Sequence, residues 1–183
     1  MPSYEGEFGT RGVLSPNGTG NERFYVMGLT DDYEDACCWY WGAKRNGGIS
    51  DYNSITSDAF GKGRSNTNTM ITKWNREAYG SKDGEGYIPD LWGVIQTRVS
   101  QGWFVPSRIE WAAFGGELGI TSENYTSYGL SRYYWSSSLC EKPTSYNATI
   151  LCFGNGKSFV STHISDYRCY GRCIRPVMRI KTQ

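Results

Sequence analysis

The sequence is poor in histidine, has almost no net charge and lacks the turn that presents a hydrolase nucleophile. His163 is the only histidine, and no Gly-x-Ser-x-Gly turn accompanies it. The 19 basic and 18 acidic residues give a formal charge of +1 and are dispersed along the chain. Proteins that grip phosphates gather a basic excess on one face. We therefore expect no catalytic residue and no nucleic-acid partner.

Long apolar segments are also missing. No run is long enough to span a bilayer, and Met1–Gly6 lacks the basic and apolar regions of a signal peptide. We expect no membrane insertion and find no sign of signal-directed export. A virion tail or a cell surface, reached through another carrier, and otherwise the cytoplasm are the alternative locations.

Hydrophobic residues make up only 38% of the 183 residues, whereas aromatics reach 15% and glycine occurs 23 times. This composition indicates a core built from Trp, Tyr and Phe and a chain that spends many residues on turns. The length favours one domain, residues 1–183. We expect an α+β fold with long irregular loops.

The six cysteines follow no metal-binding pattern. Cys37 and Cys38 are adjacent, which strains a disulfide between them, and the other four lie between residues 140 and 173. Cys169-x-x-x-Cys173 has neither a Cys-x-x-Cys partner nor a histidine pair. We interpret the cysteines as free thiols and expect no metal and no cofactor.

Residue patterns in the first two thirds of the chain predict short helices and strands. Acidic residues after Thr30 favour a helix that begins near Asp32 and runs towards Trp41. Asn66 or Thr67 is suited to cap a helix with Met70, Ile71 and Trp74 on its buried face. The remaining expected elements are a strand over 23–29, a helix over 91–99 capped by Asp90, a buried strand over 103–105, and a helix that begins with a Ser107–Glu110 capping box and ends at Gly119.

The last third predicts an antiparallel sheet. We expect strands over 133–137, 146–153, 157–162 and 174–180, with Gly154-Asn155-Gly156 as a hairpin turn. From Leu139 to Cys173 the residues follow neither a clean alternation nor a helical stripe. A regular scaffold with an irregular aromatic and polar insert is typical of a display surface.

Several motifs together resemble a known family. They are Trp103-Phe104-Val105-Pro106-Ser107-Arg108 with Glu110-Trp111, Tyr134-Trp135-Ser136-Ser137-Ser138, Phe153-Gly154-Asn155-Gly156 and Arg175-Pro176-Val177. Over roughly residues 66–180 these motifs are similar to bacterial and phage proteins of the C-type lectin fold, in particular the variable proteins of diversity-generating retroelements. The resemblance implies two or three helices packed on a small antiparallel sheet. Residues 1–65 carry no such resemblance.

In that family a reverse transcriptase copies a template with errors at adenines, and the altered copy replaces the 3′ end of the gene. Adenine-directed change does not reach Lys, Glu, Gln, Met or Trp from an Asn codon. Between Leu139 and Cys173 only Glu141, Lys142 and Lys157 are of these types. The resemblance therefore implies a variable ligand-binding region over residues 132–173, and the four cysteines in it as chance products of diversification.

The implied function is non-enzymatic display of a site for a protein or cell-surface ligand, as a monomer or an oligomer. Trp135, the following serines, Phe153 and 175–177 would be fixed framework. The expected ligand-binding residues are Arg132, Tyr133, Leu139, Cys140, Thr144, Tyr146, Asn147, Lys157, Phe159, Thr162, His163, Tyr167 and Tyr170. Tyr and Phe supply contact area at low entropic cost, and Ser and Asn supply adaptable hydrogen bonds.

Two alternatives use the same fold. Formylglycine-generating enzymes carry a copper-binding cysteine pair near the C-terminus, and Cys169 with Cys173 is similar to it but one residue short. A fixed structural module, for instance of a phage tail fibre, is the second alternative. Calcium-dependent sugar binding is disfavoured, because Lys142-Pro143-Thr144 stands where those lectins carry carboxylates or amides.

Overall fold

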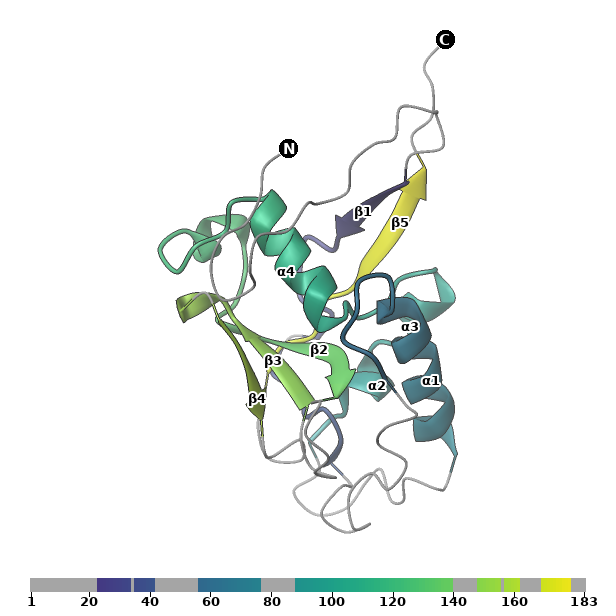
Figure 1. Ribbon diagram of the computed structural model, residues 1–183. Helices are drawn as coiled ribbons and strands as arrows, with labels where there is room; N and C mark the ends of the chain where they lie inside the picture. The colour runs from purple at the N-terminus through teal and green to yellow at the C-terminus, as the bar shows by residue number, and fades with distance from the viewer. Residues whose placement is uncertain are drawn as a thin grey trace.

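The computed structural model describes residues 23–33, 35–41, 56–76, 88–139, 148–155, 157–161 and 169–178. The helices are α1 (Gly63–Asn75), α2 (Leu91–Val94), α3 (Gln96–Ser100) and α4 (Arg108–Glu117), with 3-10 turns η4 (Tyr125–Tyr128) and η5 (Phe153–Asn155) (Figure 1). The strands are β1 (Arg23–Met27), β2 (Tyr133–Leu139), β3 (Ala148–Cys152), β4 (Lys157–Ser161) and β5 (Ile174–Met178). Helices beside small antiparallel sheets confirm the α+β class.

Strands β2, β3 and β4 form one antiparallel sheet, and β1 pairs with β5 in a separate two-stranded ribbon (Figure 1). The expectation that the last strand joins the main sheet is therefore wrong. Ile174 exchanges backbone hydrogen bonds with Phe104 on one edge of β5, each 2.8 Å long, so the opposite edge is free to pair with β1. Pro176 faces the same edge as Ile174, where its missing N–H does not interrupt the pairing with β1.

Short bridges continue the sheet beyond β2. Tyr170 pairs with Tyr134, Cys169 pairs with Cys37, and Cys38 pairs with Asp90. Segments that are far apart in the sequence are thus joined side by side, and the edge of β2 opposite to β3 is covered.

Both faces of the sheet are buried. One face packs on a cluster that includes α1 and α2, and the other packs on a cluster that includes α4 (Figure 1). The first cluster contains Trp39, Met70, Leu91, Trp92, Trp135 and Ile150, and the second contains Trp111, Ile120, Leu130, Tyr134, Leu151 and Phe153. Burial on both sides explains why β2 and β3 show no alternation of polar and apolar residues in the sequence.

Helix α1 begins at Gly63, earlier than expected. The prediction that Asn66 or Thr67 caps it is wrong, because both are buried inside the helix. The amide of Asn66 donates to the carbonyl oxygen of Ser57 (2.6 Å), and the hydroxyl of Thr67 donates to that of Val105 (3.3 Å). Their polar atoms therefore serve tertiary contacts.

The helix expected over 91–99 is divided into α2 and α3 at Ile95. Asp90 precedes α2, but its carboxylate makes no cap; it accepts from the indole of Trp74 (2.8 Å) and from the backbone N–H of Trp41. The carboxylate is thus used to join two other segments to the start of α2.

The helix expected from Asp32 to Trp41 is wrong for the residues that the structure describes there, which form bridges at Cys37 and Cys38 and no α-helix. The strand expected over 103–105 is reduced to the bridge at Phe104. The capping box of Ser107 and Glu110 at the start of α4 is confirmed.

Candidate functional site

The described candidate residues divide between two opposite ends of the β2–β3–β4 sheet. Tyr133 lies opposite Cys152, which lies opposite Lys157, at one end. Leu139 lies opposite Ala148 at the other end. Their partners on β3 are four residue steps apart, which amounts to about 13 Å. The candidates at the two ends are therefore separated by the length of β3.

Arg132 and Tyr133 form the exposed part of the first end. The guanidinium of Arg132 lies over the ring of Tyr133, 5.1 Å from its centroid, and Arg132 itself is exposed. A Cβ on Gly154 would lie 2.8 Å from Arg132 Nε, so glycine at this turn leaves room for the Arg132 side chain. A hydrogen bond to Cys152 and the proximity of Tyr133 raise the pKa of Arg132. A fixed cation on an aromatic ring is thus presented beside η5.

Tyr170 lies next to this pair. Its backbone N–H donates to the carbonyl oxygen of Tyr133 (3.1 Å), and its ring is 6.3 Å from that of Tyr134. The side chain is half-buried against the cluster of α4. The structure therefore brings Arg132 and Tyr133 together, as a surface that we call the Arg132 edge, whereas the side chain of Tyr170 packs on the opposite face of the sheet from that of Tyr133.

The expectation that Leu139 binds a ligand is wrong. Its side chain is 5% exposed and belongs to the core cluster of α1 and α2, and its N–H donates to Thr56 Oγ1 (2.8 Å). Burial of this kind excludes direct contact with a ligand in solution, so Leu139 is a core residue.

The other nine candidates are placed only in part. Lys157 and Phe159 lie on β4, opposite Cys152 and Ile150 respectively. Outside the described residues lie Cys140, Thr144, Tyr146, Asn147, Thr162, His163 and Tyr167.

The expected framework residues of β2 are buried. Three indole N–H groups make hydrogen bonds at this strand. Trp39 donates to the carbonyl oxygen of Ser136 (2.9 Å), and Trp111 donates to that of Trp135 (3.2 Å). The indole of Trp135 donates in turn to the carbonyl oxygen of Cys37 (2.8 Å). These bonds fix the strand through its backbone and do not depend on the side chains of its neighbours.

The three serines of β2 use their hydroxyls inside the protein. Ser136 donates to the carbonyl oxygen of Thr149 (2.9 Å) and Ser138 to that of Ser57 (3.1 Å), while Ser137 Oγ accepts from the amide of Asn66 (3.2 Å). All three serines are fully buried. Serine is small enough to fit between the layers and supplies the bond that each buried polar group needs.

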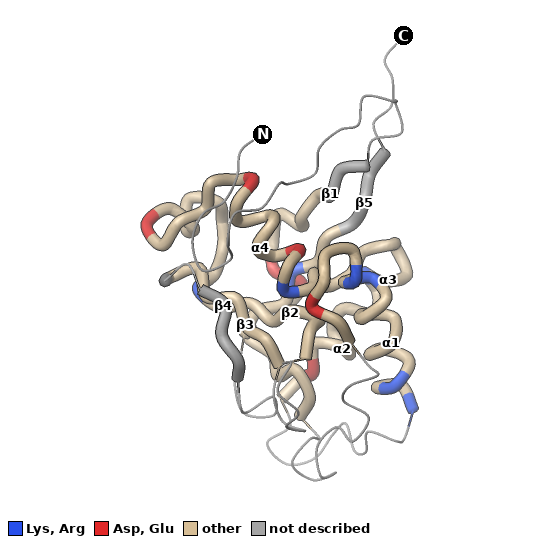
Figure 2. The backbone as a smooth tube through the Cα atoms, in the orientation of Figure 1, with Lys and Arg blue, Asp and Glu red and all other residues tan. Residues whose placement is uncertain are grey.

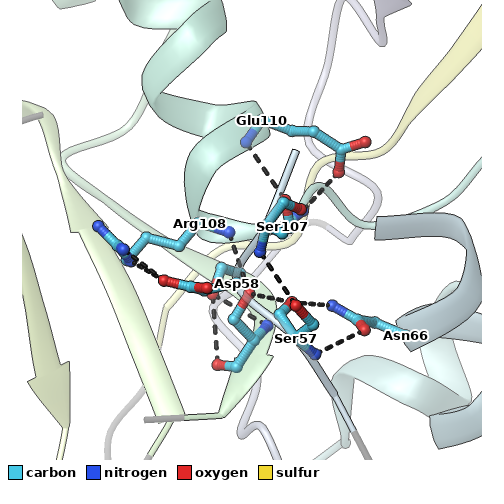
Figure 3. A network of polar contacts seen from close by, with 9 residues as sticks. Ser57, Asp58, Asn66, Ser107, Arg108 and Glu110 are labelled. Atoms are coloured by element: carbon cyan, nitrogen blue, oxygen red, sulfur yellow. Dashed lines mark hydrogen bonds and ion pairs between the residues drawn. The ribbon is translucent and has the colours of Figure 1, made fainter. Parts of the chain in front are cut away.

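A polar network continues from these serines to α1 and α4. Figure 3 shows Ser57 bound to Asn66 and the ion pair between Asp58 and Arg108. Ser107 Oγ donates to the carbonyl oxygen of Ala59 (2.9 Å). The segment 56–59 is thereby held against both helices.

Glu110 connects the starts of two helices. Its Oε2 accepts from the N–H of Ser107 (2.8 Å), which precedes α4, and from the N–H of Gly63 (3.0 Å), the first residue of α1. Burial raises the pKa of Glu110, although these hydrogen bonds act in the opposite direction. One carboxyl group thus satisfies donors of both helices.

Two partly buried ion pairs hold residues 31 and 32, which the sequence assigned to a helix start. Arg172 Nε donates to Asp31 Oδ1 (2.8 Å), as does the hydroxyl of Tyr134 (2.7 Å). Arg98 Nε donates to Asp32 Oδ1 (2.8 Å). No local spacing indicates these partners, because Asp31 and Arg172 are 141 positions apart.

Charged residues of both signs lie close together near the centre of the molecule (Figure 2). Within the described ranges, no group of three or more His, Cys, Asp or Glu residues is arranged to hold a metal ion. No helix among those residues is long and apolar enough to cross a membrane.

The five described cysteines are buried. Burial raises the pKa of Cys37, Cys169 and Cys173 far above that of an exposed thiol. Cys152, Cys169 and Cys173 lie inside the region 132–173, yet each is at most 1% exposed. These three are core positions and do not contribute to an exposed surface.

No protein-family profile matches the chain. No curated protein sequence matches it significantly.

Proposed function

We propose that this chain is a non-enzymatic binding module of the C-type lectin fold. Adenine-directed mutagenic retrohoming would vary exposed positions between residues 132 and 173, so that different copies bind different protein or cell-surface ligands. The observation that carries the proposal is the burial of strand β2. Its motif Tyr134-Trp135-Ser136-Ser137-Ser138 is fully buried, whereas Arg132, just before the strand, is exposed.

A diversified surface requires a scaffold that is indifferent to the varied side chains. Three side chains that bind β2 come from outside the region 132–173: Trp39, Asn66 and Trp111. They bind backbone carbonyls of the strand or the hydroxyl of Ser137. Changes at exposed neighbours would leave these bonds in place, which is what repeated diversification demands.

The Arg132 edge supplies the described part of the binding surface. Arg132 and Tyr133 offer a cation and an aromatic ring at low entropic cost. Leu139, Cys152, Cys169 and Cys173 are removed from the varied set by their burial. We expect variation to be confined to the exposed positions of the region.

Sequencing the native locus around the 3′ end of the gene tests the proposal. The expected result is a nearby near-copy of the region encoding residues 134–175 beside a reverse transcriptase gene. Its differences from the gene should lie at template adenines and should spare the codons of the buried Trp135, Cys152 and Cys173. A locus without such a copy overturns diversification. A copy that differs mainly at buried positions contradicts the assignment of framework and surface.

A further inference from the structure

Cys37 and Cys169 lie directly opposite each other in an antiparallel bridge. The N–H of Cys37 donates to the carbonyl oxygen of Cys169 (2.9 Å), and the N–H of Cys169 donates to that of Cys37 (3.1 Å). Residues that exchange both bonds have Cα atoms about 5.5 Å apart, with side chains on the same face. Disulfides span Cα separations of about 4.4–6.8 Å. The backbone is therefore placed for a cross-link.

The two thiols meet inside the core. Cys37 Sγ is 3.5 Å from the carbonyl oxygen of Cys169, and both side chains are fully buried. Burial raises the pKa of each thiol, and the charge that Cys37 would carry as a thiolate adds to the raised pKa of Cys169, as do those of Cys152 and Cys38. The opposition of the two backbones in the bridge is what singles out Cys37 as the partner of Cys169.

The other described thiols are held elsewhere. Cys38 pairs with Asp90, and successive side chains of an extended segment point to opposite faces, so Cys38 points away from Cys37's partner. The backbone N–H of Cys173 donates to the Asp32 carboxylate (2.6 Å). Cys152 lies on β3 beside Arg132. Only Cys37 and Cys169 oppose each other among the thiols that the structure describes.

We propose that Cys37 and Cys169 form a reversible disulfide when the protein meets a low-molecular-weight disulfide. One cysteine, as its thiolate, attacks the small disulfide; a mixed disulfide forms and one small thiol leaves. The other cysteine then attacks the protein-bound sulfur, which forms the Cys37–Cys169 bond and releases the second small thiol. Two electrons pass from the protein to the oxidant, and the two cysteine protons end on the two small thiols.

The structure determines how this cross-link behaves. Opposite Cβ atoms are about 4.5–5.5 Å apart in strand pairs and about 3.5–4.5 Å apart in disulfides, so closure draws the segments together by up to about 2 Å. The strained bond is easily reduced, and full burial makes its formation depend on local opening. It needs no ligand and is independent of the binding function proposed above.

Peptide mapping of the oxidised protein tests the proposal. The full chain is incubated with oxidised glutathione in sub-denaturing urea, alkylated and digested with trypsin without reduction. Trypsin cleaves after Arg168 and Arg172, so Cys169 is released in a peptide separate from Cys173. The expected product joins the peptide 169–172 to the peptide that contains Cys37, two hydrogens lighter than the sum of the two.

Variants identify the partner within the Cys37–Cys38 peptide. Cys38→Ser should retain the linked product, and Cys37→Ser should lose it. The link closes a long loop between residues 132 positions apart, so we expect it to raise the unfolding midpoint by about 5 °C, reversed by dithiothreitol. A dominant link of Cys169 to any other cysteine overturns the proposal. So do glutathione adducts, or free thiols after prolonged incubation, at both positions without the link.

Discussion

Among the described glycines, Gly63 is the one where an added Cβ would have least room. A Cβ at this position would lie 2.2 Å from Glu110 Oε2, 2.8 Å from the carbonyl oxygen of Val105 and 2.9 Å from the ring of Phe104. Any side chain must therefore displace backbone as well as the capping carboxylate. Glycine here is a requirement of the contact between the start of α1 and α4.

We predict that Gly63→Ala lowers the free energy of unfolding by about 3 kcal/mol, because the added methyl group overpacks the junction. Urea denaturation measures the loss. Asn68→Ala, at an exposed position of the same helix, is the matched control and should be neutral or slightly stabilising. Equal stability of Gly63→Ala and the wild type would contradict the close approach described above.

Glu110 gives stability a pH dependence whose sign follows from its raised pKa. The folded protein holds the carboxyl proton more tightly than the unfolded chain does, so this contribution is fully present below the unfolded-state pKa. It is lost as the pH rises through the folded-state pKa. Glutamine cannot titrate and keeps an oxygen that accepts from Ser107 and Gly63.

We therefore predict that the unfolding free energy of the wild type, relative to that of Glu110→Gln, decreases as the pH is raised from below the ordinary carboxyl range. Urea titrations of both proteins over a series of pH values measure the difference. A difference that grows with pH would show that the hydrogen bonds to Oε2 outweigh burial and that the pKa is lowered.

At the residue scale, local signals were predictable and long-range ones were not. The Ser107–Glu110 capping box was correct because its members are three positions apart on one helix. The second contact of Glu110, with Gly63, joins residues 47 positions apart. No spacing rule reaches that far. The partners of Asp31 could not be predicted for the same reason, because they too are distant in the sequence.

At the scale of elements, the arginine of the segment before β5 ties the two ends of the described chain together. Arg172 is 3% exposed; it binds Asp31 and donates to the carbonyl oxygen of Gly129 (2.6 Å). Its guanidinium also lies over the ring of Tyr134, 5.5 Å from the centroid. Removing the cation would leave a carboxylate and a carbonyl without their donor.

We predict that Arg172→Met lowers the free energy of unfolding by about 3 kcal/mol, because breaking one half of a buried ion pair leaves the other half uncompensated. Chemical denaturation measures it. Arg76→Met, at an exposed position after α1, is the control and should change stability by less than about 0.5 kcal/mol. Similar small effects of both substitutions would mean that water replaces Arg172 at Asp31.

The sequence pattern was enough to predict that a segment is a helix or a strand. Where the element begins and which element it pairs with depended on tertiary contacts. The buried stripe of α1 was found, yet its start moved to Gly63 because Glu110 supplies the cap. The strand β5 was also found, but its pairing with β1 joins the two ends of the described chain. Strand patterns in sequence indicate extension and burial without naming the neighbour.

At the scale of the whole molecule, the sheet separates the candidate site into exposed and buried parts. The sequence identified β2 as framework and its surroundings as surface, but not which neighbours point inward. Leu139 continues the β2 strand into the core, whereas Arg132 precedes it at the opposite end. The burial of both faces erased the alternation that would have distinguished them.

The division leads to a paired prediction at the two ends of β2. Leu139→Ala should lower the free energy of unfolding by about 3 kcal/mol, because it opens a cavity in the cluster of α1 and α2. Arg132→Ala should cost less than about 1 kcal/mol, since the contact with the Tyr133 ring and the hydrogen bond to Cys152 are made by an exposed side chain. Urea denaturation of the two variants decides between this arrangement and a uniformly exposed insert, in which both changes would be mild. If Arg132→Ala proves as damaging as Leu139→Ala, the Arg132 edge is framework, and diversification there could not preserve the fold.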